Sequence, residues 1–435
     1  MPGETQARTR LAAADEASAG RRAFGLRALA IAAVVVLLAI AAAVKLPCVS
    51  APGRQIDYCR TQIPTAYLEH GLARSSAPFG GRGADAVPFH EPALVALLEE
   101  ATGLLTHAIH QVDAADYAKR STATVAELTA DPAVLREAGT FFWLNAGLLS
   151  VAAVAAMALL QRMLGSLRWF RGLACVAPLM VLESFEGWHW IGILALVTAV
   201  WAWRQRKLVL TGALLGIGAA AAPAVAGLGL ALVAIAVNRR RPRVVLLPLV
   251  TAVVAWVALN APWLALHPTG WLSSHLTTVI RPSLADPEQT SIWRYLRPGL
   301  GEQPGLIPFM VCGGALVATV IALVWFAGLA RRPAGLTSYG LIALAILLVT
   351  TPSYLPADAL LLLPLALLTN RRLSLLAAWV MAELANTFAS WPQLYHRLVG
   401  ADEVIGVGTA IRVLGQLGLV VVVVTLLLRP RSHHR

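Results

Sequence analysis

Long apolar segments recur along this chain, and the first of them, GLRALAIAAVVVLLAIAAAVKL at residues 25–46, indicates that the chain folds in a lipid bilayer. About twenty apolar residues in a row form a helix that crosses a hydrocarbon core roughly 30 Å thick. Hydrophobic residues make up 58% of the 435 positions and charged residues only 13%, a balance that excludes a water-soluble domain of this size. The sequence therefore predicts an all-α polytopic membrane protein.

The other apolar segments predict further membrane helices, for a total of about twelve. They lie near residues 140–162, 172–184, 188–203, 208–222, 223–237, 244–264, 306–329, 336–351, 355–369, 373–390 and 404–428. Several are short and contain Pro or Gly, which is typical of broken helices that line a cavity.

Basic residues determine the expected orientation. The formal net charge is +12, but these residues form no helical face and no patch interleaved with aromatic rings, so no nucleic-acid partner is expected. They fall in short clusters between apolar segments, for example at residues 168–171, 204–207 and 239–243. By the positive-inside rule this spacing places both termini in the cytoplasm and the poorly basic connections on the outer face.

Two polar tails and two outer loops complete the predicted organisation. The composition of residues 1–24 predicts a disordered cytoplasmic tail, and that of residues 429–435 a basic cytoplasmic tail. We expect residues 140–428 to form the membrane bundle, with an outer loop at 265–305. Residues 47–139 predict a large outer-face loop domain. Its EPALVALLEEATGLLTHAIHQV stretch predicts an amphipathic helix that lies on the membrane or packs against the bundle.

Cys48 and Cys59 both lie in the first outer loop, eleven positions apart. A disulfide persists in an oxidising compartment, so a bridge between them and a pair of free thiols both remain open.

The candidate functional residues lie in the outer connections, because no motif of the familiar soluble enzymes is present. Asp57 follows the first span closely, where a carboxylate at the membrane surface is placed to act as a base for a sugar hydroxyl, or is a simple turn residue. Glu186, Trp188 and His189 occupy a tight connection, LESFEGWHWIG, where charge is costly unless it meets water or a ligand. They are sugar-binding candidates, with an interfacial aromatic belt as the alternative.

The outer loop 265–305 combines Arg281, Arg294 and Arg297 with several aromatic residues. Guanidinium groups bind phosphate in a bidentate way and aromatic rings meet sugars or lipids. The three arginines are therefore candidates for donor phosphate binding, although contacts with lipid headgroups also explain them.

Several segments, in this order, resemble a family. They are YCRTQIPTAYLEHGL, FHEPALVALLEEATG, FEGWHWIGILALVTAVWAWRQRKLVLTGALLGIGAAAAP, LNAPWLALHPTGWL with TSIWRYL, and LLLLPLALL before an arginine pair. Between about residues 48 and 425 the chain resembles the actinobacterial polyprenol-phosphate-mannose-dependent membrane glycosyltransferases of the GT-C class, family 87, which are alpha-1,2-mannosyltransferase-like. The resemblance implies a GT-C-like fold in a bacterial plasma membrane and an acidic base in the first outer loop.

Three positions depart from the family pattern. Gln62 stands where the acidic residue is expected, His189 ends the Gly-Trp-His that replaces an expected Asn-Trp-Asp, and Ala222 stands where a Lys is expected. Either the catalytic base has moved, to Asp57 or Glu91, or the chain has kept the fold and lost transfer activity.

The leading hypothesis is a membrane glycosyltransferase that moves a hexose, mannose by resemblance, from a polyprenyl phosphate donor to an envelope glycolipid or glycan acceptor. The expected partners are that donor, that acceptor and membrane lipids. No cofactor is expected and no metal ligands are assigned, with the metal requirement left open. The alternatives are a catalytically degenerate member that binds a lipid-linked glycan and, from another class, a transporter or flippase.

Overall fold

The fold is a helical bundle with a small helical domain at one end. The computed structural model describes the backbone of residues 2–50, 59–74, 91–239, 243–266, 335–350, 354–369, 372–389 and 401–428, with isolated positions between 268 and 329, and the side chains from residue 25 onward in most of these ranges. The regular structure of these residues is helical and contains no extended strand. This confirms the predicted all-α class.

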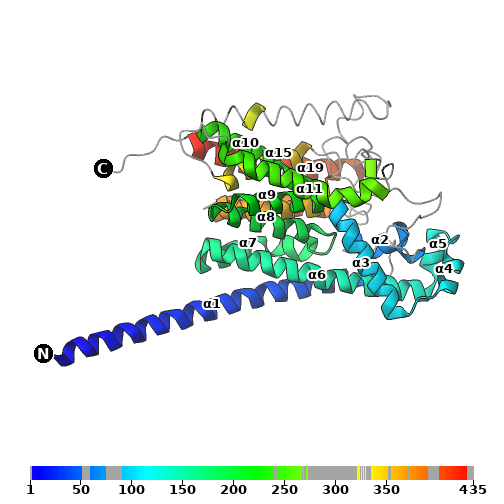
Figure 1. Ribbon diagram of the computed structural model, residues 1–435, viewed down its shortest axis with the longest axis horizontal. Coiled ribbons are helices and arrows are strands. Elements are labelled where there is room, and N and C mark those ends of the chain that lie inside the picture. Colours follow the sequence, from blue (N-terminus) through cyan, green and yellow to red (C-terminus); the bar gives the residue numbers. More distant parts are fainter. Residues whose placement is uncertain are drawn as a thin grey trace.

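The bundle helices lie alongside one another, along the long axis of the molecule (Figure 1). They are α1 (Pro2–Ser50), α6 (Pro132–Leu164), α7 (Ser166–Glu183), α8 (His189–Arg204), α9 (Leu208–Ala221), α10 (Gly227–Arg239), α11 (Arg243–Leu266), α15 (Leu336–Thr350), α16 (Ala359–Thr369), α17 (Leu373–Ala389) and α19 (Ala401–Leu428). The first turn of α1 and the last turn of α19 lie at the end of the bundle opposite the small domain.

Length and composition make this a membrane protein. Four stretches, Gly25–Ser50, Pro132–Leu164, Arg243–Leu266 and Gly406–Thr425, are long and apolar enough to cross a bilayer. Leucines and valines on these stretches are exposed, as at Val254 with 62%, which suits a lipid surrounding. Every other predicted span coincides with a shorter described helix, except 306–329, which lies mostly outside the described residues. The number twelve therefore stays a prediction.

Two helix boundaries differ from the predicted segment boundaries. Helix α1 begins at Pro2, inside the segment predicted as a tail, because the Ala, Glu and Arg of residues 2–24 are good helix formers. The loop domain ends at Asp131 rather than 139, since Asp131 caps α6 by accepting a hydrogen bond of 2.8 Å from the Ala133 N–H, with Pro132 at the first helical position.

The loop domain, which we define as residues 59–131, contains α2 (Ile63–Glu69), α3 (Ala93–His110), α4 (Ala114–Arg120) and α5 (Val125–Ala130). It lies at one end of the bundle, on the right in Figure 1. A disulfide between Cys48 and Cys59, whose Cα atoms are 5.8 Å apart, ties its start to the end of α1. The bridge that the sequence left open is therefore present.

Helix α3 turns its polar face inward. The predicted apolar face exists, but Leu104, Leu105 and Ile109 on it are 37%, 48% and 53% exposed. The face packed against the protein carries Glu99 and His107 instead. An exposed leucine row beside a membrane bundle fits an interfacial helix, and the buried acidic face supplies groups to the site described below.

Small residues let the bundle helices approach closely. A Cβ on Gly212 or Gly216 of α9 would overlap a backbone carbonyl of α11, that of Pro248 and that of Ala252 respectively. The Gly-x-x-x-Gly spacing is the usual device for close packing of membrane helices. With this spacing, α9 and α11 are the most closely packed helix pair among the described residues.

Candidate functional site

Two distant segments meet where the loop domain joins the bundle. The Thr61 hydroxyl donates to the Phe185 carbonyl at 2.6 Å, and the Gln62 N–H donates to the Glu186 carbonyl at 2.8 Å. These bonds place the TQIP segment, residues 61–64, along the connection between α7 and α8. A Cβ at Gly187 would lie 3.4 Å from Nδ1 of His189 and 3.7 Å from Oε1 of Gln62, so both side chains border the same point.

His189 forms a pair with a carboxylate from a third segment. Its Nε2 lies 3.1 Å from Oδ1 of Asp358, and Oδ2 of Asp358 accepts the Leu355 N–H at 2.8 Å. An ionised carboxylate only accepts, so the proton of a neutral His189 lies on Nε2 and Nδ1 carries a lone pair. Nδ1 is buried and has no hydrogen-bond partner among the described residues. The side chains remain 14% and 19% exposed.

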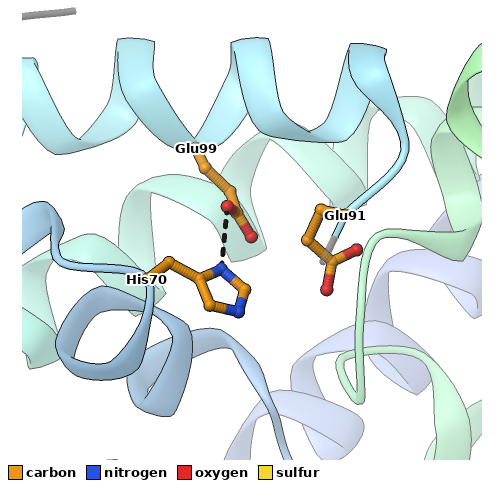
Figure 2. A group of neighbouring side chains, drawn as sticks. All are labelled: His70, Glu91 and Glu99. Atoms are coloured by element: carbon orange, nitrogen blue, oxygen red, sulfur yellow. Dashed lines mark hydrogen bonds and ion pairs between the residues drawn. The ribbon is translucent and has the colours of Figure 1, made fainter. Parts of the chain in front are cut away.

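Three further ionisable groups gather in the loop domain: His70 after α2, Glu91 before α3, and Glu99 within α3 (Figure 2). The His70 Nδ1 atom lies 3.1 Å from Oε2 of Glu99. Burial, and then the Glu99 carboxylate, raise the pKa of Glu91 to about 7, while His70 and His189 act in the opposite direction. The influence of His189 on Glu91 makes the two groups parts of one polar region.

Glu186, one of the predicted sugar ligands, forms a buried ion pair with Arg60. Its Oε1 lies 2.6 Å from Nε of Arg60, and its side chain is 1% exposed. Burial alone would raise the pKa of this carboxyl, but the Arg60 guanidinium, together with Glu183, Lys45 and His189, acts in the opposite direction and the pKa is lowered. Glu186 therefore holds the TQIP segment in place by an ion pair.

Trp188, the second predicted sugar ligand, is buried at 4% exposure. Its indole N–H donates to Oδ1 of Asn145 at 2.8 Å, and the Asn145 amide in turn donates to Thr102 of α3 at 3.0 Å. Trp188 is thus a buried link in a hydrogen-bond chain from α8 through α6 to α3, and its assignment as a sugar ligand stays a prediction. Of the three predicted sugar ligands, His189 has a side-chain nitrogen that borders the same point as Gln62 and has no hydrogen-bond partner among the described residues.

The three positions that depart from the family pattern lie in one region. Gln62 and His189 border Gly187, as described above. Ala222 follows α9, and a Cβ at Gly192, one turn after His189 on α8, would lie 2.8 Å from the Ala222 Cβ. Small residues therefore let α8 and the residue after α9 approach closely, one turn from His189.

A buried polar cluster adjoins Asp358 from the bundle side. Glu383 of α17 accepts from the Tyr354 hydroxyl at 2.8 Å and from the Trp379 indole at 2.9 Å. The Arg412 guanidinium lies 3.8 Å from the centre of the Tyr354 ring. Arg412 is fully buried, and its Nε and Nη2 atoms have no hydrogen-bond partner among the described residues. A buried arginine in a membrane bundle is costly, so Arg412 is a candidate functional residue.

Other predicted site residues cannot be placed. Asp57, Arg281, Arg294 and Arg297 lie outside the described residues. Sequence reasoning in turn assigned no role to His70, Glu99, Asp358 or Arg412, because no local motif links any of them to a partner.

Comparison with protein-family models, with curated proteins and with solved structures finds no match to this chain.

Proposed function

We propose that this membrane protein is a glycosyltransferase that moves a hexose, with mannose as the first candidate, from a polyprenyl phosphate to an envelope glycolipid or glycan. The order of segments that resemble family 87 supports the class. One structural observation carries the proposal: the His189–Asp358 pair presents a buried, open nitrogen beside Gln62, where the resemblance expects a catalytic acid. A relocated base would occupy this place.

The arrangement supports a direct displacement. The acceptor hydroxyl gives its proton to Nδ1 of His189 while its oxygen bonds to the anomeric carbon. The bond from that carbon to the phosphate oxygen breaks, and the polyprenyl phosphate leaves with the electron pair. Asp358 holds the imidazole through Nε2 and stabilises the imidazolium that forms, which is the role of a carboxylate behind a general-base histidine.

The donor phosphate requires positive charge. In this proposal Arg281, Arg294 and Arg297 of the loop 265–305 bind it, as their residue type suggests. The buried guanidinium of Arg412 lies against the ring of Tyr354, four residues before Asp358 in the chain. It adds positive potential to this region. Glu91, on the other side of His189, is the second candidate base, and Asp57 the third.

The test is transfer of labelled mannose from polyprenyl phosphate mannose by membranes that contain the protein. General-base catalysis contributes roughly 10²- to 10⁴-fold, so His189→Gln should lose activity by about that factor and Asp358→Asn by somewhat less. Glu91→Gln and Asp57→Asn should retain it. His110→Gln is the matched control, because His110 lies in the loop domain and contacts Thr140 of α6 rather than the site.

A rescue experiment separates a base from a structural histidine. Introducing Gln62→Glu into the His189→Gln variant returns a carboxylate to the family position beside the same point, and should recover a measurable part of the transfer. If Glu91→Gln loses activity while His189→Gln stays active, the catalytic base is Glu91 rather than His189. No transfer by the wild type, with donor binding intact, would favour the degenerate member, and substrate uptake by proteoliposomes would favour the transporter.

A further inference from the structure

His70, Glu91 and Glu99 converge from three separate places in the loop domain. His70 follows the last turn of α2, Glu91 precedes α3, and Glu99 lies two turns inside α3. Each offers one nitrogen or oxygen atom, and these atoms all lie within 4.8 Å of one another. In Figure 2 the three side chains point toward a common centre, with the two carboxylates on different sides of the imidazole.

One carboxylate oxygen in this cluster lacks a partner. Glu99 is 3% exposed, and its Oε2 is close to His70, but Oε1 is buried and accepts no hydrogen bond from the described residues. A buried carboxylate oxygen without a partner is costly, and a bound cation is one of the few ways to compensate it. A second carboxylate, Glu91, directed at the same centre adds repulsion that a cation would also relieve.

We propose that His70, Glu91 and Glu99 bind a divalent first-row transition cation, with Zn²⁺ as the first candidate. An imidazole with two carboxylates is a mixed nitrogen and oxygen set that suits Zn²⁺ or Mn²⁺ better than the all-oxygen sites of Ca²⁺ and Mg²⁺. Tetrahedral Zn²⁺ with bonds of about 2.1 Å separates its ligand atoms by about 3.4 Å. Moderate side-chain rotation reaches that spacing from the present positions.

Three ligands among the described residues leave a fourth position of a tetrahedral cation for water or a further ligand, as in catalytic sites. The cation would also join the end of α2 to α3 across the segment between them. The inference does not depend on the glycosyltransferase proposal, because metal binding is measured without any sugar donor.

The experiment uses the full chain in nanodiscs, in a His433→Ala/His434→Ala background that removes the histidine pair of the C-terminal tail as a competing site. After chelation and desalting, Zn²⁺ is titrated by calorimetry and the bound metal is counted by mass spectrometry. One ion per chain is expected. His70→Gln, Glu91→Gln and Glu99→Gln should each weaken binding at least about 10- to 100-fold, the range that even outer-shell changes produce.

Matched controls are Glu69→Gln, the exposed neighbour of His70, and His110→Gln, a loop-domain histidine outside the cluster. Both should bind like the background protein. Absence of saturable binding, or equal binding by the three cluster variants and the controls, overturns the proposal. Glu99 is buried, so Glu99→Gln could fail to fold for structural reasons. In that case the result for Glu91→Gln, at a half-buried residue, decides whether the cluster binds the cation. X-ray absorption should then show one imidazole ligand that disappears in His70→Gln.

Discussion

At the scale of single residues, a chain of hydrogen bonds through His107 explains how the loop domain holds its shape. Glu137 accepts from Arg120 and from the Tyr67 hydroxyl at 2.7 Å. The Tyr67 oxygen must then accept from Nε2 of His107 at 2.9 Å, which leaves Nδ1 to accept from the Tyr117 hydroxyl at 2.8 Å. In this order of donors and acceptors His107 is neutral, with its proton on Nε2.

A pH dependence of stability follows. Burial lowers the pKa of His107 in the folded protein, whereas the unfolded chain has a pKa of about 6.5. Below that pH the unfolded state binds more protons, so stability is full above about pH 6.5 and decreases as the pH falls toward the folded pKa. The thermal unfolding midpoint in nanodiscs, measured from pH 8 to pH 5, should fall less steeply for His107→Gln than for the wild type. Parallel curves would contradict this assignment.

The buried Arg120–Glu137 pair gives a second prediction. Its two Nη atoms lie 2.8 and 2.9 Å from the two carboxylate oxygens, and both residues are at most 5% exposed. Removing one partner leaves an uncompensated buried charge, which costs about 3 to 5 kcal/mol. Arg120→Met should therefore destabilise the protein strongly in a denaturant or thermal scan.

Lys119→Met is the control for that measurement. Lys119 is the adjacent residue, its side chain is 76% exposed, and it lies 3.7 Å from Asp131. Exposed pairs contribute about 0 to 1 kcal/mol. Similar losses in the two variants would mean that the bidentate pair does not stabilise the domain.

At the scale of elements, glycine packing between α9 and α11 is testable. A Val at Gly216 would collide with the Ala252 carbonyl of α11, so Gly216→Val must push the helices apart, at a cost of about 1 to 3 kcal/mol or more. We expect a lower unfolding midpoint and a smaller monodisperse fraction in size-exclusion chromatography. Gly147→Val, at a helical position with no neighbour within 4 Å, should behave like the wild type.

Helix positions were readable from the sequence because apolar length determines them, and α3 was readable from its period. Its orientation was not, since Leu105 and Ile109 would have the same period on a buried or a lipid-facing surface. The site was less accessible still. His189 and Gln62 drew attention as departures from a family pattern, but their closeness, and the pairing of His189 with Asp358, depend on tertiary contacts between segments far apart in the chain.

At the scale of the whole molecule, the disulfide bears on orientation. Cys48–Cys59 lies at the loop-domain end, and disulfides persist in oxidising compartments. The opposite end carries the first turn of α1 and the last turn of α19, next to basic segments of the sequence. Both features agree with the proposed topology, in which the loop domain lies outside and the termini are cytoplasmic.

Thiol labelling of intact cells tests this topology. In a Cys175→Ser/Cys312→Ser background, a membrane-impermeant maleimide should label Cys48 and Cys59 only after an impermeant reductant has opened the bridge. In a second variant, with Ser432→Cys added and the bridge left intact, the new thiol should react only after lysis. Labelling of the loop-domain thiols that requires lysis would place that domain in the cytoplasm. The glycosyl transfer proposed here would then face the wrong leaflet for an envelope acceptor, so this measurement constrains the function as well as the fold.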